Sequence, residues 1–355
     1  MSVLFSPMTL RGTTTRNRVW VSPMCQYSSI DGHPTDWHLV HLGSFARGGA
    51  GLVMAEATAV SPEGRISPED AGIWNDAQAA DYRRITDFIR SQGAVPAIQL
   101  AHAGRKASTR APWRGRGYVP VEEGGWPTVG ASAVGYADWP APRELTADEL
   151  AAFPQVWADA ARRSLDAGFE VIEVHAAHGY LLHQFLSPLT NRRTDAWGGD
   201  LAGRSRLLLD VVDAVRAALP DDVPLLVRLS ATDWVDGGLS VDETARVARI
   251  LADHGVDLVD VSSGGNSPAQ QIAPSPGYQV PFATRIREES GLPVAAVGLI
   301  TEPQQAEEVV ATGRADAVFL ARELLRDPSF AQRAAAELGA DAYWPDQYLR
   351  ARPGA

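Results

Sequence analysis

Two histidines and a tyrosine stand close together in the sequence, at His175, His178 and Tyr180. Such a group could bind a metal ion, serve a structural role, or join two hydrogen-bond donors to a proton donor. A zinc site needs about four ligands, and no cysteine or suitably spaced carboxylate accompanies these residues. We therefore expect no metal. The pattern favours two imidazoles that stabilise a developing oxyanion, with the Tyr180 phenol as proton donor. A structural role is the alternative.

The segment 22–27 follows the first short apolar run and contains Cys25 and Tyr27. Cys25 is the single cysteine of the chain. It forms no internal disulfide and cannot hold an iron–sulfur cluster, which needs about four thiolates. A lone cysteine is usually a small buried hydrophobe. Its place at a strand end, beside a tyrosine, keeps a functional role equally open.

The segment 99–106 offers an amide and a cation. Gln99 lies within an apolar run, and a buried amide needs partners for both its oxygen and its nitrogen. Its edge can pair with the donor–acceptor edge of a pyrimidine-like ring. Lys106 is the one lysine among 32 Lys and Arg residues. That makes it a candidate functional cation, although chance is a fair explanation as well.

Arginines mark further strand ends. Arg228 lies inside an apolar run, where a guanidinium is costly unless it meets an anion. It could form a buried ion pair or stabilise a negatively charged cofactor. Gly298, Ala321 and Arg322 follow the last two apolar runs, the usual phosphate site of an α/β barrel. Backbone N–H groups and an arginine fork suit a terminal phosphate, although Arg322 could equally form a surface ion pair.

These residues belong to short apolar runs that alternate with amphipathic ones. The expected strands are 18–21, 51–59, 95–101, 171–176, 224–230, 258–262, 294–297 and 317–320. Helices are expected at 81–91, from Thr146 to near Gly168, at 204–219, and from Ser240 to near Gly255. Thr146 and Ser240 each begin a capping box. Parallel strands covered on both faces are nearly all apolar, so the alternation predicts a single (β/α)8 barrel over residues 1–355.

Two segments depart from this repeat. Residues 104–145 are rich in Gly, Pro and Trp and follow the third strand. They should therefore lie on the face where such barrels build active sites, and we expect a lid there, with a plain surface excursion as the alternative. Residues 339–355 form a tail that carries Trp344 and Tyr348. An exposed aromatic cluster usually marks an interface.

Composition excludes several classes of function. Hydrophobic residues make up 45% and charged residues 21% of the chain, which is ordinary for a folded globular protein. The net charge of -11 argues against a nucleic-acid partner. No apolar run is long enough to span a bilayer, and residues 1–10 lack the features of a secretory signal. We therefore expect a cytoplasmic protein that has neither a nucleic-acid nor a membrane partner.

The segments 22–27, 99–106, 173–180, 186–195 and 321–323 together resemble the old yellow enzyme family, and the resemblance extends over nearly the whole chain. It is closest to the bacterial thermophilic-like branch of NADPH dehydrogenases and xenobiotic reductases, because Cys25 stands where other branches carry threonine. Ala321 departs from the glycine that usually precedes the phosphate-binding arginine. No cysteine follows Cys25, which excludes the relatives that reduce dienoyl-CoA thioesters.

The resemblance implies an FMN cofactor, with NADPH or NADH as the hydride donor. The residues that we expect around FMN are Ser22, Pro23, Met24, Cys25, Ala57, Gln99, Arg228, Gly298, Ala321 and Arg322. Those expected at the substrate are Tyr27, Lys106, His175, His178, Tyr180 and Arg350. His175, His178 and Tyr180 would act in catalysis, together with Cys25 near the redox-active edge of the flavin.

The implied reaction is a ping-pong reduction of activated C=C bonds in α,β-unsaturated carbonyl or nitro compounds. The alkene would be held by His175 and His178, receive a hydride at its β-carbon, and take a proton from Tyr180 at its α-carbon. The alternative is a flavin-free, phosphate-binding barrel such as an aldolase or isomerase. A Schiff-base aldolase favours a lysine within a strand, whereas Lys106 follows one.

The same branch implies a homodimer or homotetramer. In it, the tail arginine Arg350 would reach the active site of a neighbouring subunit. The alternative is a tail that caps the bottom of its own barrel.

Overall fold

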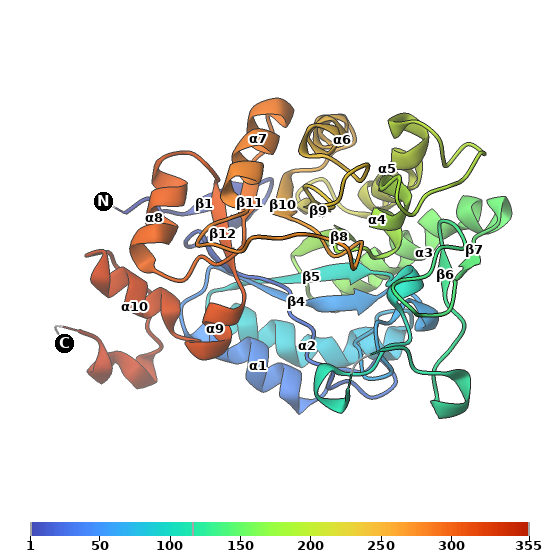
Figure 1. Cartoon of the computed structure of the whole chain (residues 1–355). Coiled ribbons are helices and arrows are strands. Elements are labelled where there is room, and N and C mark those ends of the chain that lie inside the picture. Colours follow the sequence, from blue (N-terminus) through green and yellow to red (C-terminus); the bar gives the residue numbers. More distant parts are fainter. Residues whose placement is uncertain (1, 116, 354–355) are drawn as a thin grey trace.

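The computed structural model describes residues 2–115 and 117–353, and in it eight parallel strands close into a barrel (Figure 1). The order around the barrel is β10-β11-β12-β3-β4-β5-β8-β9. The strands are β3 (Val19–Val21), β4 (Leu52–Ala59), β5 (Val95–Ala101), β8 (Val171–Ala176), β9 (Leu225–Ser230), β10 (Leu258–Ser262), β11 (Val294–Ala296) and β12 (Ala317–Leu320). The predicted barrel is confirmed, with each strand end within one residue of its expected position. Residue 116 of the expected lid and residues 354–355 of the expected tail lie outside the described residues.

Helices follow the strands and cover the outside of the barrel (Figure 1). They are α1 (Asp36–Arg47), α2 (Asp76–Ser91), α3 (Ala147–Asp166), α4 (Leu181–Leu186), α5 (Leu201–Ala218), α6 (Val241–Asp253), α7 (Val280–Ser290), α8 (Pro303–Ala311), α9 (Arg322–Arg326) and α10 (Phe330–Glu337). The capping boxes at Thr146 and Ser240 are confirmed. α2 and α5 begin earlier than predicted because Asn75 and Asp200 cap them. Within the described residues, no helix is long and apolar enough to cross a bilayer.

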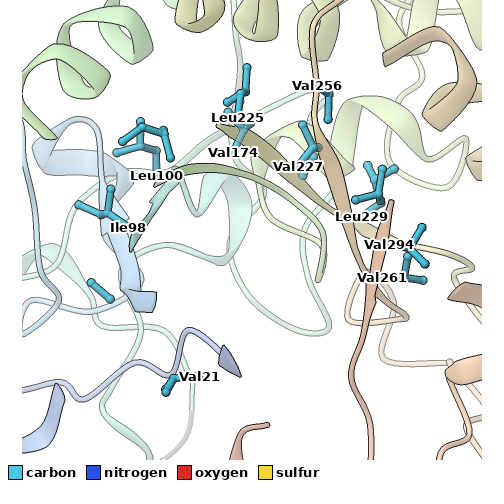
Figure 2. Packing of buried hydrophobic residues seen from close by; sticks show 14 of the residues in the cluster. Val21, Ile98, Leu100, Val174, Leu225, Val227, Leu229, Val256, Val261 and Val294 are labelled. Atoms are coloured by element: carbon cyan, nitrogen blue, oxygen red, sulfur yellow. The ribbon is translucent and has the colours of Figure 1, made fainter. Parts of the chain in front are cut away.

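The apolar residues of the strands divide between two faces. One set packs outward against the helices, and Figure 2 shows Ile98, Val174 and Val227 among them. The other set points into the barrel near the amino-terminal ends of the strands. This double coverage is why the strands are nearly continuous apolar runs. An unpredicted hairpin of β1 (Met8–Leu10) and β2 (Thr13–Thr15) adds Met8 and Leu10 to the inner set and so closes that end.

The barrel interior changes from apolar to polar toward the carboxyl ends of the strands. Side chains alternate along a strand, so the residues two positions beyond inner apolar residues also point inward. Beyond the inner residues Ala97, Val171, Leu226 and Leu258 these are Gln99, Glu173, Arg228 and Asp260, which are at most 5% exposed. Polar groups therefore gather near the mouth of the barrel, where this fold places its sites.

Residues 104–145 have little regular structure. They contain the short strands β6 (Val129–Gly130) and β7 (Arg143–Glu144), which pair in parallel, and several 3-10 turns. Arg105 donates hydrogen bonds to the carbonyls of Val134 and Gly135. The segment therefore folds back over the end of β5.

Arg193, from the loop after α4, holds the far end of this segment. Its Nη1 donates to the carbonyls of Ala131 (3.1 Å) and Leu145 (2.7 Å), and its Nη2 pairs with Asp195. We predict that Arg193→Ala lowers the free energy of unfolding by about 3 kcal/mol, because it leaves buried carbonyls without a donor. Arg192→Ala is the matched control, since Arg192 is exposed, and should change it by less than about 0.5 kcal/mol. Equal urea midpoints for the two variants would contradict this account.

Candidate active site

The end of β8 brings His175, His178 and Tyr180 into one cluster. The ring centroid of His175 lies 5.1 Å from that of His178 and 5.0 Å from that of Tyr180, both edge to face. His178 and Tyr180 are 6.5 Å apart. Among the described residues, no group of three or more His, Cys, Asp or Glu side chains is arranged to hold a metal ion. The three rings that are neighbours in the sequence therefore form one site in space.

Burial sets the protonation of this cluster. Burial, followed by the nearby charge of Arg228, lowers the pKa of His175 and His178 well below the ordinary histidine value. Burial also raises the pKa of the Tyr180 phenol. At neutral pH the imidazoles are therefore neutral and the phenol is protonated. Each imidazole carries one N–H donor, and Tyr180 keeps a proton that it can give.

Hydrogen bonds decide which ring nitrogen of each imidazole can donate. Nδ1 of His175 accepts a hydrogen bond from the backbone N–H of Ala177 (3.2 Å), so the proton of His175 is on Nε2. Nε2 of His178 lies 2.7 Å from Oγ of Ser262. A hydroxyl can donate or accept. When the Ser262 hydroxyl donates to Nε2, the proton of His178 is on Nδ1, which is then the nitrogen that can donate to a ligand.

The loop after β3 places Cys25 beside the cluster. Cys25 is half-buried and packs, with Tyr180, against the small apolar group that includes Ala57. Burial, followed by the charges of Asp70 and Glu56, raises the pKa of the Cys25 thiol. The residue is therefore held as a thiol, which is a weaker nucleophile than a thiolate.

A buried carboxylate holds this loop in place. Glu56, at the bulge of β4, accepts a hydrogen bond from the backbone N–H of Gln26 and lies 2.7 Å from Nε2 of His38. The loop then turns sharply at Tyr27, which has a left-handed φ of 50°. The ring of Tyr27 reaches Trp113 of the segment 104–145, with 5.6 Å between centroids.

Four charged or amide side chains form two pairs inside the barrel below the cluster. Nε2 of Gln99 donates to Oε1 of Glu173 (2.7 Å). Nε of Arg228 lies 2.9 Å from Oδ2 of Asp260, and its Nη2 donates to Oγ of Ser22 (3.3 Å). Of the two roles open to Arg228, the buried ion pair is therefore present. Burial raises the pKa of Glu173 to about 8 and that of Asp260 to about 6, so the two carboxyls together retain a proton near neutral pH.

The ends of β11 and β12 border a cavity of about 210 Å³. Its lining includes Gly298, Ala321, Arg322 and Arg326. Gly298 has a φ of 118°, and a Cβ there would lie 2.6 Å from Nε2 of Gln279, so only glycine fits. Backbone N–H groups and an arginine fork at a concave site suit a phosphate.

Two further residues were expected at the substrate, Lys106 in its own chain and Arg350 in the site of a neighbouring subunit. Nζ of Lys106 donates to the carbonyls of His178 and Gly265, at 2.8 Å each. Arg350 is exposed in the terminal 3-10 segment Asp346–Ala351. Figure 1 shows this end of the chain on the opposite side from β6 and β7. Arg350 does not join the cluster of its own chain.

Sequence reasoning missed the residues that hold the site in place. Glu56, Glu173 and Asp260 lie inside otherwise apolar strands. An isolated charged residue in such a strand indicates a buried polar contact, so these three could have been found from the sequence. His183 and Gln184 gave no such signal, since polar residues in a short helix are usually exposed. Both are buried in α4.

Known proteins resemble this chain in sequence. The family described as NADH:flavin oxidoreductase / NADH oxidase family matches residues 3–341. The NADPH dehydrogenase of Geobacillus thermodenitrificans is 47% identical, over 98% of this chain and 98% of its own. The NADPH dehydrogenase of Listeria welshimeri is 46% identical, over 99% of each chain.

Two solved structures have the same fold. Morphinone reductase superposes with a TM-score of 0.80 at 27% identity, over 97% of this chain and 92% of its own. The old yellow enzyme homologue from Zymomonas mobilis superposes with a TM-score of 0.79 at 26% identity, over 96% of each chain. The chain therefore belongs to the NADH:flavin oxidoreductase / NADH oxidase family, to which the old yellow enzymes belong, and is an oxidoreductase that uses FMN and a nicotinamide donor.

Proposed function

We propose that this protein is an ene-reductase that uses NADPH to reduce activated C=C bonds in α,β-unsaturated carbonyl or nitro compounds. The observation that carries the proposal is the cluster of two neutral imidazoles and a protonated phenol at the barrel mouth. Imidazole N–H groups suit an oxygen that gains negative charge, and a phenol suits the delivery of a proton. The names of the bacterial relatives support NADPH as the donor.

The residues around the mouth fit FMN. The cavity at Gly298 and Arg322 would take the phosphate, and the methyl of Ala321 would still allow its backbone N–H to bind there. Gln99 would offer an amide edge and Arg228 a cation to the polar edge of the ring. The residues that would line the ring are Ser22, Pro23, Met24, Cys25 and Ala57.

When bound, FMN would supply hydride transfer from the nicotinamide to the β-carbon of the alkene. His175 and His178 would hold the carbonyl or nitro oxygen through their N–H groups, and Tyr180 would protonate the α-carbon. Cys25, held as a thiol, would tune the cofactor and substrate affinity and would not attack the substrate. The flavin-free aldolase or isomerase is set aside, because the chain belongs to a flavin-dependent family.

Residues 104–145 would act as a lid over this mouth. Trp126 packs against the same apolar group as Cys25 and Tyr180. Trp113 of the segment meets Tyr27, which would face the substrate. A lid that excludes water strengthens each polar contact beneath it. Because nicotinamide and alkene would occupy the same covered place in turn, the order is ping-pong.

We also propose a homodimer or homotetramer in which subunits share their sites. The outer face of α1 and α2 carries a groove of about 330 Å³, lined by Leu39, Val40 and Phe88 among others. Tyr348 of the tail contacts Arg47 at the end of α1. Exposed apolar side chains gathered in this way favour a protein contact. Arg350 follows Tyr348 by two residues in the terminal 3-10 segment and would complete the substrate pocket of the partner.

The phosphate contact gives the first functional prediction. Arg322→Ala should weaken FMN binding roughly 10- to 100-fold, because a hydrogen bond to a charged group contributes about 1.5–3 kcal/mol. Arg326→Ala is the matched control, since Arg326 lines the same cavity but pairs with Glu323, and its effect should be smaller. Fluorescence titration of the apoprotein with FMN measures both. Release of FAD by the denatured wild-type protein would contradict the phosphate assignment.

The second functional prediction concerns His175 and His178 as donors to the substrate oxygen. His178→Ala should slow reoxidation of the reduced protein by 2-cyclohexenone about 10²-fold, the usual effect of losing one oxyanion donor. Reduction by NADPH should change far less. His254→Ala is the control, because His254 lies at the end of α6 and pairs with Asp213. Anaerobic stopped-flow absorbance follows each half-reaction. An unchanged reoxidation rate in His178→Ala would exclude this role.

The third functional prediction concerns the substrate pocket that two subunits would share. Arg350→Ala and His178→Ala chains, mixed and reassembled after gentle unfolding, should regain activity above either parent. A hybrid dimer then holds one site with an intact His178 and an Arg350 donated by its partner.

If the tail served its own barrel, every site in the hybrid would lack one group and no rise would appear. A protein that is monomeric at the assay concentration by analytical ultracentrifugation would end the shared-site model.

A further inference from the structure

The turn between His175 and Tyr180 has an unusual backbone. His178 and Gly179 have positive φ angles of 59° and 74°. A non-glycine residue in this left-handed region costs roughly 1 kcal/mol or more. At Gly179 a Cβ would lie 2.4 Å from the carbonyl oxygen of Gly265, so the neighbouring loop leaves no room for one. Other groups must therefore stabilise this turn.

All the backbone polar groups of His178 and Gly179 are held by side chains. For His178, the N–H donates to Oγ of Ser230 (2.9 Å) and the carbonyl accepts from Nζ of Lys106 (2.8 Å). For Gly179, the N–H donates to Nδ1 of His183 and the carbonyl accepts from Nε2 of Gln184, at 2.8 Å each. These side chains come from β9, from the segment after β5, and from α4. The turn is thus fixed from several elements at once.

Among these side chains, Lys106 brings a charge and joins two loops. Its Nζ also donates to the carbonyl of Gly265 (2.8 Å), the same oxygen that borders Gly179. The ammonium lies 5.1 Å from the centroid of the Tyr180 ring. Hydrogen bonds from a charged donor are about twice as strong as neutral ones. One side chain therefore ties together the loops after β5, β8 and β10 and touches the ring of the proton donor.

We propose that Lys106 is a positioning residue, which holds the His178 carbonyl so that both imidazoles stay aimed at the substrate oxygen, and that it does not bind the substrate itself. The inference rests on the proposed roles of His175 and His178. It differs from the expectation that Lys106 contacts the substrate. Two N–H donors of the ammonium already bind the backbone carbonyls of His178 and Gly265. We call this pair of hydrogen bonds the Lys106 clamp.

The surroundings of Lys106 make this clamp sensitive to pH. Burial, followed by the charge of Arg105, lowers the pKa of Lys106 to about 7. Because this pKa is lowered, the ammonium is present below about pH 7 and is lost as the pH rises above it. The other groups that face it are the neutral imidazoles of His175 and His178 and the rings of Tyr136 and Tyr180. The clamp is therefore strongest on the acid side of its pKa.

The test separates positioning from substrate binding. FMN-loaded Lys106→Met, reduced anaerobically, is mixed with increasing 2-cyclohexenone, which yields a limiting reoxidation rate and a half-saturating concentration. A lost clamp should lower the limiting rate roughly 10- to 100-fold, the scale for a small misplacement of catalytic groups, with little change in half-saturation. A raised half-saturating concentration at an unchanged limiting rate would overturn the proposal.

Two controls accompany this variant. Arg162→Met removes an exposed cation on α3 that pairs with Asp159, and should behave as wild type. Lys106→Arg keeps donors for both carbonyls and should restore much of the limiting rate. A wild-type protein that fails to reduce the enone would refute the proposed function, whereas the Lys106 result is read only against a working wild type.

The pH profile gives a second readout that does not depend on Lys106→Met folding. The wild-type limiting rate should fall as the pH rises through about 7, and the fall should be smaller in Lys106→Arg, whose guanidinium stays charged. The carboxyls of Glu173 and Asp260 also titrate in this range. The contribution of Lys106 is therefore given by the difference between the pH profiles of the wild type and Lys106→Arg. Identical profiles would overturn the clamp.

Discussion

The left-handed turn at His178 and Gly179 is the constraint on which the arrangement of the site depends. β8 places His175 inside the barrel. The chain must then turn within a few residues so that His178 and Tyr180 lie at the mouth of the barrel beside His175. Glycine permits the reversal, and hydrogen bonds from Lys106, Ser230 and α4 hold it. Because those groups come from separate strands and loops, the barrel itself sets the spacing of the three rings. A site built this way is preorganised for charge that develops during the reaction.

Burial gives this geometry its chemical character. It keeps the histidines neutral and the phenol of Tyr180 protonated, so the three rings offer donors while they themselves carry no charge. Farther inside the barrel, two carboxyls lie near Arg228. Asp260 forms an ion pair with Arg228, and Glu173 binds Gln99. A buried guanidinium can be balanced by one carboxylate, so the second carboxyl favours its protonated form. The interior below the proposed cofactor is therefore close to neutral.

Much of this architecture could be predicted from local patterns. The strands are nearly continuous apolar runs, so their positions follow from the sequence alone, and the same runs place His175 and Arg228 in the carboxyl-terminal halves of β8 and β9. The starts of α2 and α5 were missed because the first turns after Asn75 and Asp200 hold at most one large apolar residue and so show little of the helical apolar period. The partners of Arg228 and Lys106 could not be predicted, because each lies on another strand or loop and is known only once the barrel closes. Lys106 is a candidate functional residue because it is the single lysine of the chain. Its residue type alone does not distinguish a contact with the substrate from hydrogen bonds to backbone carbonyls.

A single-turnover experiment tests the central claim most directly. The purified protein is reduced anaerobically with NADPH, freed of nicotinamide by gel filtration, and mixed with 2-cyclohexenone while the flavin absorbance and the product are followed. If the cluster at the end of β8 acts with FMN as described, the oxidised flavin spectrum returns and saturated ketone forms in a stoichiometric amount relative to FMN. A reduced flavin that persists in the presence of the enone, or that is reoxidised without saturated product, would contradict the account.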